Sequence, residues 1–226
     1  MIPWELLGET RTPDGDLIAL TRHGSEYVIS AGGLPLMSSR MHGSEEALAA
    51  YGCARARTLD EPRVLVGGLG MGFTLRATLD LLPPSATVVV AELVAGVVEW
   101  NRGPLGSLAD HPLKDKRVIV DLNDVGATIS ASGRRFDAIL LDVDNGPAAF
   151  TASRNAELYG DRGLAAARAA LRPGGVLAVW SAREDRKFEQ RLRYGGFAVA
   201  VERVRGRLKK GGPRHVIFVG AAASSA

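Results

Sequence analysis

The sequence predicts an α/β protein with a mostly parallel sheet that ends in an antiparallel hairpin and is preceded by a small antiparallel sheet. Apolar runs such as 88–91 and 138–141 are continuous, which is typical of strands buried on both faces of a parallel sheet. Helix-like segments separate these runs, and a glycine-rich stretch follows the first strand. A chain of 226 residues is long enough for one such domain plus a small appendage.

The first 42 residues alternate in the manner of short strands joined by turns, with turn signals at 13–15, 23–24 and 31–33. This pattern predicts a small antiparallel β-sheet as a separate N-terminal unit, 1–42. Its expected strands are 4–10, 17–22, 27–30 and 36–38.

A helix is expected directly after this unit. Ser44 precedes two acidic residues, Glu45 and Glu46, and then an alanine-rich run. Serine is a preferred N-cap, and acidic side chains stabilise the first turn of a helix. We therefore expect a helix that Ser44 caps and that reaches about Ala56.

From there strands and helices alternate through a main domain, 43–220. The turn-forming segment 172–175 is expected to stop a helix and lead into the fifth strand of this series. The closing helix, strand, turn and strand predict an antiparallel hairpin, and 221–226 is expected to be a disordered tail. The expected strands are 63–67, 87–91, 117–121, 137–142, 175–180, 197–204 and 215–220, and the expected helices are 72–82, 94–101, 124–132, 159–171 and 184–194.

The glycine-rich stretch indicates a nucleotide site, because glycines let the backbone approach a ligand and supply amide donors at a helix start. Glu92 ends the next strand, where a carboxylate can hold a ribose diol. Bulky Phe73 follows the glycines, so the third glycine of a dinucleotide fingerprint is missing, which disfavours a nicotinamide dehydrogenase. A turn without a ligand is the alternative. The cofactor-binding candidates in this stretch are Gly67, Gly68, Gly70 and Gly72.

Further carboxylates follow the third and fourth strands. Asp124 is placed to accept from an exocyclic amine or, equally, to cap the next helix. Asp142 and Asp144 end the fourth strand, at the edge where open α/β sheets bind ligands. Two carboxylates there can steer an amine, attract a sulfonium and accept a proton, and an Asx turn is the alternative.

His42 and Glu45 lie at the start of the first helix, which should face the mouth of this site. An imidazole and a carboxylate there could recognise a substrate amine or move a proton. Helix capping by Glu45 and a surface turn at His42 are the simpler alternatives.

Several segments together resemble the spermidine synthase (polyamine aminopropyltransferase) family over roughly residues 15 to 200. The resemblance implies a class I S-adenosylmethionine (AdoMet) methyltransferase-type, Rossmann-like fold, with AdoMet or decarboxylated AdoMet as ligand, no metal, and an amine as acceptor. It further implies that the glycine loop and Glu92 hold the methionine-derived part and the ribose, that Asn123 and Asp124 hold the adenine amino group, and that Asp142 binds the ligand. The segments are 61–72, 91–93, 123–124, 136–142 and 171–177.

Three departures from the family pattern bear on the reaction. The segment 142–147 replaces Asp-x-x-Asp-Pro, 37–46 replaces the polyamine-site Asp-Glu-x-x-Tyr-His, and 69–71 lacks an Asp that follows the family's glycines. Aminopropyl transfer and methyl transfer to an unknown substrate therefore both stay open.

Composition limits the compartment and the partners. No apolar run reaches the length of a membrane span and no signal peptide is evident, so we expect a soluble cytoplasmic protein. Cys53 is the sole cysteine and is expected to be a buried apolar residue. From Arg183 onward there are eleven Lys and Arg against four Asp and Glu, but these are scattered along a helix and a hairpin without aromatic interleaving to stack bases, so we expect a solvated basic face and not a nucleic-acid site. A non-catalytic nucleoside-binding protein that contacts RNA through the basic C-terminal hairpin is the alternative function. Free edges of the N-terminal sheet suggest a homodimer.

Overall fold

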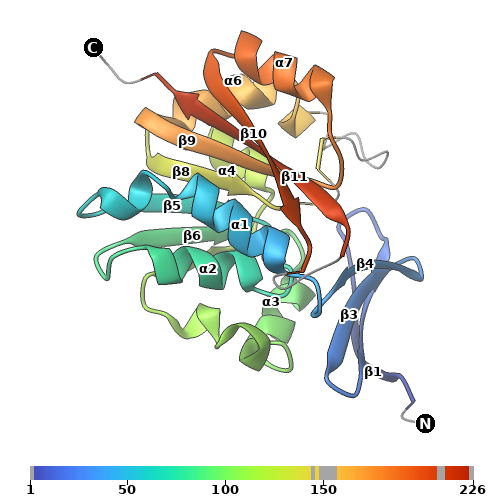
Figure 1. The fold of residues 1–226 in the computed structure, drawn as a ribbon. Coiled ribbons are helices and arrows are strands. Elements are labelled where there is room, and N and C mark those ends of the chain that lie inside the picture. Colours follow the sequence, from blue (N-terminus) through green and yellow to red (C-terminus); the bar gives the residue numbers. More distant parts are fainter. Residues whose placement is uncertain (1–2, 144–145, 148–156, 208–211, 224–226) are drawn as a thin grey trace.

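The computed structural model describes residues 3–143, 146–147, 157–207 and 212–223 (Figure 1). It contains a four-stranded antiparallel sheet followed by a seven-stranded sheet flanked by helices, as the sequence predicts. The first sheet contains β1 (Glu5–Arg11), β2 (Leu17–His23), β3 (Glu26–Ala31) and β4 (Leu34–Ser38). The second contains β5 (Arg63–Gly67), β6 (Thr87–Ala91), β7 (Val118–Asp121), β8 (Phe136–Leu141), β9 (Leu171–Ser181), β10 (Phe197–Arg205) and β11 (Arg214–Ala222).

The helices form two layers, one on each face of the large sheet. An apolar core lies between the sheet and each layer: one core includes residues of α1, α2 and α3, and the other includes residues of α4, α6 and α7. Short 3₁₀ turns follow α1 and α3. The helices are α1 (Gly43–Gly52), α2 (Phe73–Leu81), α3 (Ala95–Arg102), α4 (Val125–Ser130), α6 (Asp161–Ala170) and α7 (Arg186–Tyr194), and the 3₁₀ turns are η1 (Ala56–Thr58), η2 (Gly106–Ala109) and η3 (Pro112–Lys114).

The strand order of the large sheet is β10-β11-β9-β8-β5-β6-β7. Strands β7, β6, β5, β8 and β9 are parallel, and β11 lies antiparallel to both β9 and β10. This topology confirms the predicted C-terminal hairpin. The order reverses between β5 and β8, and the crevice at the carboxyl ends of such strands is where open α/β sheets bind ligands.

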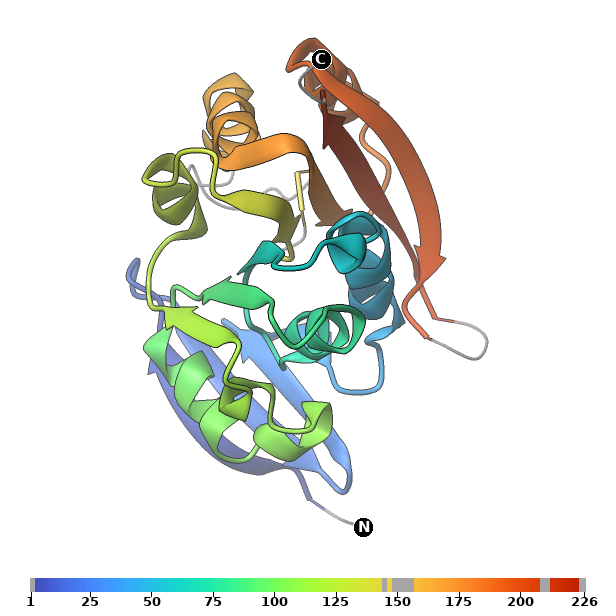
Figure 2. The same cartoon turned by 90° about the vertical axis from the view of Figure 1, so that its left-hand side faces the viewer.

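The N-terminal sheet lies against α3 (Figure 2), and two glycines at this contact have no room for a side chain. A Cβ added to Gly8 would lie 2.6 Å from the Trp100 indole nitrogen, and one added to Gly96 would lie 2.5 Å from Cβ of Thr10. At the other side of this sheet, the Met37 side chain of β4 reaches the glycine loop after β5. The small sheet therefore lies beside the predicted ligand site.

The start of α1 differs from the prediction. The helix begins at Gly43 with His42 at the N-cap, and His42 makes no side-chain capping bond. Ser44, predicted as N-cap, is buried inside the first turn, where its hydroxyl donates to the Glu45 carboxylate at 2.7 Å. The prediction was wrong because Gly43 N–H bonds the carbonyl of Gly206, a tertiary contact that starts the helix earlier.

Two boundaries near the C-terminus also differ. The segment 172–175, predicted as a turn, lies within β9, where the pairing with β8 shifts register between Phe136 and Ala138. It is therefore an irregularity within the strand. Ala221 and Ala222, predicted to belong to a disordered tail, pair with β10 as part of β11, while 224–226 lie outside the described residues.

Candidate functional site

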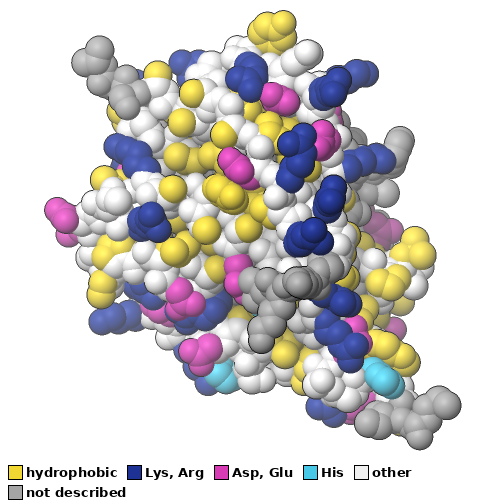
Figure 3. All heavy atoms as spheres, viewed as in Figure 1, with side chains coloured by type: hydrophobic (Ala, Val, Ile, Leu, Met, Phe, Trp, Pro, Cys, Tyr) yellow, Lys and Arg dark blue, Asp and Glu magenta, His cyan; other side chains and the backbone are white. Residues whose placement is uncertain are grey.

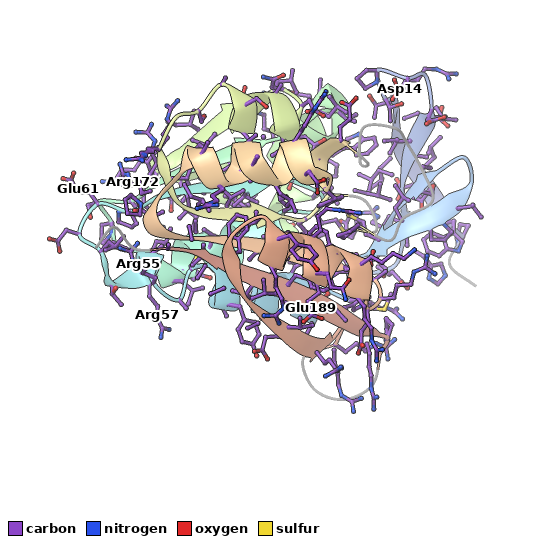
Figure 4. All side chains as sticks on the ribbon, turned by 90° about the horizontal axis from the view of Figure 1, so that it is seen from above. Asp14, Arg55, Arg57, Glu61, Arg172 and Glu189 are labelled. Atoms are coloured by element: carbon purple, nitrogen blue, oxygen red, sulfur yellow. The ribbon has the colours of Figure 1, made fainter. Side chains whose placement is uncertain are left out.

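The glycine loop, Glu92 and Asp142 lie at the carboxyl ends of β5, β6 and β8. Each of these strands is buried, and each ends in a glycine or is followed by a carboxylate. The opposite end of the sheet carries Arg55, Arg57, Glu61 and Arg172, whereas Asp14 lies at the end with the N-terminal sheet (Figure 4). The clustered arginines are thus separate from the candidate site.

The glycine loop between β5 and α2 has a backbone that other residues rarely adopt. Gly68, Gly70 and Gly72 have φ angles of 88°, 51° and 86°. A Cβ at Gly68 would lie 2.4 Å from the backbone oxygen of Asp142, so this position also needs glycine for close approach of β8. Gly67 has ordinary backbone angles, but a Cβ there would lie 2.7 Å from Val125 Cγ2.

Glu92 holds the glycine loop directly. Its carboxylate accepts from the Leu69 N–H and from the Val94 N–H, both at 2.9 Å, and the residue is 8% exposed. Burial raises the pKa of Glu92, while these backbone N–H groups lower it. The contact of Glu92 with ribose stays a prediction, and its contact with the loop is a role that sequence reasoning missed.

Asn101, in α3, is a second residue that sequence reasoning missed. Its side-chain amide donates to the carbonyl of Gly70 at 2.8 Å and of Val97 at 2.9 Å. The residue is 1% exposed, and among the described residues its Oδ1 has no hydrogen-bond partner. A Cβ on Gly72 would lie 2.9 Å from that oxygen. A polar side chain among the apolar residues of a predicted helix was the available signal.

Asp142 and Glu45 bring two carboxylates to the mouth of the site. Asp142 follows β8 and accepts from the Thr74 hydroxyl at 2.5 Å. Glu45 comes from α1 and is close enough for the charge of Asp142 to raise its pKa. For Glu45, burial raises the pKa more than the charge of Asp142 does, and the pKa is raised to about 8. Burial raises the pKa of Asp142 to about 6. Helix capping was the alternative role for Glu45. In the structure its carboxylate accepts a hydrogen bond from the Ser44 hydroxyl.

The remaining predicted residues lie around this centre. Asp124 is the N-cap of α4 and accepts from Ala127 N–H at 3.0 Å, and Asn123 Oδ1 accepts from Asp124 N–H at 2.9 Å. The capping role predicted for Asp124 is confirmed, and both side chains lie beyond the end of β7. Their contact with adenine stays a prediction. Asp144 lies outside the described residues.

His42 stacks on a ring at the start of α2. Its imidazole lies 4.2 Å from the centroid of Phe73 with an interplanar angle of 15°, and its Nδ1 is 2.8 Å from Glu46 Oε1. Both the stacking and this contact fix the ring beside the glycine loop. His42 and Glu46 are therefore bound to each other, and Glu45 is the carboxylate of this turn that faces Asp142.

Two surface hollows are lined by none of the predicted site residues. One, of about 270 Å³, lies between α7 and β10, and another, of about 500 Å³, lies beside Arg117 and the end of α2. The first holds paired charges, Arg203 with Glu184 at 2.6 Å and Arg193 with Glu189 at 2.8 Å. Figure 3 shows basic side chains over this face with acidic ones between them. This pairing favours a solvated face over a nucleic-acid site.

Two further observations concern membranes and metals. No helix in the described part of the chain is long and apolar enough to cross a membrane. Among the same residues, no group of three or more His, Cys, Asp or Glu is arranged to hold a metal ion.

The fold has a class I methyltransferase-like architecture, and the solved structures that it matches include spermidine synthases. One, in complex with the transition-state analogue AdoDATO, is 16% identical, with a TM-score of 0.74 over 97% of this chain and 73% of that one. The spermidine synthase from Thermotoga maritima is 16% identical, with a TM-score of 0.75 over 97% and 74%. A probable spermidine synthase from Corynebacterium glutamicum ATCC 13032 is 19% identical, with a TM-score of 0.64 over 95% and 79%. No protein-family model and no curated protein matches the sequence. The chain therefore has a spermidine synthase-like fold.

Proposed function

We propose that this chain is a transferase that binds decarboxylated AdoMet or AdoMet and moves an alkyl group from sulfonium to an amine. The observation that carries the proposal is the approach of the glycine loop to the end of β8, where Gly68 lies against Asp142. Backbone that only glycine tolerates and a partly exposed carboxylate then lie on the same crevice. The spermidine synthase-like fold supports the same reading.

The residues present fit an adenosyl ligand. Gly68 and Gly70 leave their backbone uncovered by side chains of their own, and the flexible Met37 thioether lies 3.1 Å from where a Gly70 Cβ would be. Met37 would then form a wall of the site that can move aside. Glu92 would accept from the ribose, Asp124 with Asn123 from the adenine amino group, and Asp142 would attract the charged tail.

When bound, a sulfonium ligand supplies an electrophilic carbon and a neutral thioether as leaving group. An amine lone pair forms the C–N bond as the C–S electron pair returns to sulfur. The chain would hold the two groups in line, exclude water and take the proton that the nitrogen loses. Among the described residues, Asp142 and Glu45 are the carboxylates that would accept that proton from the nitrogen.

Aminopropyl transfer is the form of the reaction that these charges favour. A decarboxylated ligand ends in an ammonium group, which two neighbouring carboxylates attract. The ligand of a methyltransferase keeps a carboxylate, which Asp142 and Glu45 would repel. Methyl transfer, a nucleoside-binding role without turnover, the homodimer and the cytoplasmic location stay as predictions to be tested.

Calorimetry with 5′-methylthioadenosine, decarboxylated AdoMet, AdoMet and NAD tests the proposal. We expect 5′-methylthioadenosine to bind, decarboxylated AdoMet to bind more tightly than AdoMet, and NAD not to bind. Glu92→Gln should weaken every adenosyl ligand, and the matched change Glu99→Gln, at an exposed ion pair of α3, should not. Absence of binding by all adenosyl compounds would contradict the proposal, and tight NAD binding would restore the dehydrogenase hypothesis.

A further inference from the structure

Three arginines lie at the amino ends of three neighbouring strands, at the end of the sheet opposite the candidate ligand site. Arg63 is the first residue of β5, Arg135 directly precedes β8, and Arg172 is the second residue of β9. Because β5, β8 and β9 are adjacent and parallel, these three positions meet at the same edge of the sheet. The proposed transfer uses none of them.

A buried carboxylate, Asp137 of β8, contacts two of these arginines at once. Its Oδ2 accepts from the backbone N–H of Arg63 and from a guanidinium nitrogen of Arg172, both at 2.8 Å. Asp137 is 3% exposed, so both contacts lie where water does not compete for them. Strands β5 and β9 are therefore joined at their starts through one oxygen atom of the strand between them.

Arg135 lies on the same face of the sheet. Its guanidinium carbon is 6.0 Å from the centroid of the Phe136 ring, and Phe136 belongs to the core on the side of α4, α6 and α7. Leu65, two residues after Arg63 in β5, belongs to that core as well, so the alternation of side chains along the strand directs Arg63 to the same side. In agreement, burial lowers the pKa of Arg63 most, and the charges of Arg135 and Arg172 lower it further.

The positive charge of this arginine cluster (Arg63, Arg135 and Arg172) exceeds what its surroundings offset. Asp137 forms an ion pair with Arg172, whereas among the described residues neither Arg63 nor Arg135 has a carboxylate partner. Two positive charges are left without a counterion. The Nε of Arg63 is also buried, and it has no hydrogen-bond acceptor in the part of the chain that the structure describes. Buried donors are rarely left without a partner in native proteins, so the cluster lacks an anionic acceptor.

We propose that Arg63, Arg135 and Arg172 bind a phosphate group, free or carried by a small molecule, at the amino end of the sheet. This second ligand site is separate from the proposed transferase site. A phosphate dianion matches the two positive charges without a counterion, and its tetrahedral oxygens can accept from three guanidinium groups at once. A carboxylate ligand has two oxygens and one charge, so it would satisfy fewer of these donors.

A compact anion fits this end of the molecule better than a nucleic acid does. Figure 4 shows Arg55 and Arg57 at the same end, with Glu61 beside them, and all three side chains are exposed. An exposed carboxylate would repel a second phosphate of a nucleic-acid backbone. A single phosphate at the arginine cluster has no such conflict, because Asp137 is buried and already paired.

Calorimetry at pH 8, where phosphate groups carry two negative charges, tests the site. The wild-type protein is titrated at constant ionic strength with inorganic phosphate, glycerol 3-phosphate, acetate and a short DNA duplex. We expect saturable binding of the two phosphates and roughly tenfold or weaker binding of acetate. Tighter binding of glycerol 3-phosphate would identify an ester as the ligand, and tighter binding of inorganic phosphate would identify the free anion.

Two variants and a matched control locate the binding. Arg135→Gln should weaken phosphate binding by roughly tenfold or more, and its side chain is exposed, so its melting temperature without phosphate should stay that of the wild type. Arg63→Gln should weaken binding equally, because its backbone N–H still donates to Asp137. Arg205→Gln, at an exposed arginine of β10 that has no ion pair within the described ranges, should bind phosphate like the wild type.

NMR of the arginine Nε–H groups gives a second readout. Inorganic phosphate should shift the signals of Arg63, Arg135 and Arg172 with one common dissociation constant and leave the signal of Arg205 in place. The site would be overturned if the wild type did not bind either phosphate, if acetate bound as tightly, or if Arg205→Gln lost as much affinity as Arg135→Gln. Binding of the DNA duplex without binding of either phosphate would overturn it in favour of a nucleic-acid surface. Arg135→Gln should keep the wild-type affinity for 5′-methylthioadenosine, so failure of this site and failure of the transferase proposal are distinguishable.

Discussion

The side-chain amide of Asn101 donates to the carbonyl oxygen of Gly70 at 2.8 Å, so α3 holds the glycine loop that follows β5. The same amide group donates to Val97 within its own helix. A single buried residue thereby links the helix after β6 to the loop before α2. The conformation of the loop depends on this residue as well as on its glycines.

Asn101→Leu should loosen the glycine loop. The change removes both donors and leaves the Gly70 carbonyl without its partner, which costs about 1–3 kcal/mol when the group stays buried. For a domain of this size the melting temperature should fall by roughly 2–4 °C for each kcal/mol. Thermal denaturation measures the first effect, and calorimetry with 5′-methylthioadenosine should show weaker binding. Gln190→Leu, at an exposed amide of α7, should change neither; equal effects of the two variants would refute the role of Asn101.

Gly68→Ala and Gly70→Ala should differ sharply. Both positions have positive φ, which costs an alanine roughly 1–2 kcal/mol. At Gly68 the new Cβ would also meet the backbone oxygen of Asp142 at 2.4 Å, whereas at Gly70 it would meet the flexible Met37 thioether at 3.1 Å. Urea denaturation should therefore rank Gly68→Ala as clearly less stable. Equal stabilities would mean that the loop can shift away from β8. Gly70→Val should keep the fold and lose the adenosyl ligand, because the branched side chain would enter the crevice.

Several features of this site could be predicted from the sequence. Strands β5 and β6 have the predicted bounds, because buried apolar runs with sharp polar or glycine ends define them locally. The same local reasoning placed Glu92 and Asp142 at the edge of the sheet. It failed where a tertiary contact decides the structure. The start of α1 depends on a bond to Gly206, and the loop contacts of Glu92 and Asn101 depend on how separate segments pack.

The stability of the protein should fall as the pH rises, because of the raised pKa values of Glu45 and Asp142. In the folded protein the pKa of Glu45 is raised from 4.5 to about 8 and that of Asp142 from 3.8 to about 6. A raised pKa means that the protonated form favours folding. The stabilisation is complete below the unfolded values and is lost between about pH 4 and pH 8. Melting temperatures measured from pH 5 to 8.5 should decline accordingly.

Glu45→Gln isolates this effect. The neutral amide should flatten the decline between pH 6 and 8.5 and make the variant more stable than the wild type at pH 8.5. The expected difference is at least about 1 kcal/mol, or roughly 2–4 °C. Glu46→Gln should keep the wild-type slope. If Glu45→Gln kept the wild-type slope, the protonation of Glu45 would not be the cause of the decline in stability.

Glu92→Gln should reduce both stability and ligand affinity. The glutamine can accept from only one of the two N–H groups that Glu92 bonds, because its NH₂ group faces the other donor. We expect a loss of about 1–3 kcal/mol in unfolding free energy and roughly 1.5–3 kcal/mol in binding of an adenosyl ligand. Denaturation and calorimetry measure these separately. A folded variant with unchanged affinity would restrict Glu92 to holding the loop.

Product analysis tests the central claim most directly. The protein is incubated with decarboxylated AdoMet and 1,4-diaminobutane, and in parallel with AdoMet and the same diamine, and the products are identified by mass spectrometry. We predict 5′-methylthioadenosine and an aminopropylated diamine in equal amounts from the first mixture, with Asp142→Asn strongly impaired. S-adenosylhomocysteine from the second mixture alone would show methyl transfer instead. No nucleoside product from either mixture, in a protein that binds both ligands, would contradict the assignment as a transferase acting on this amine.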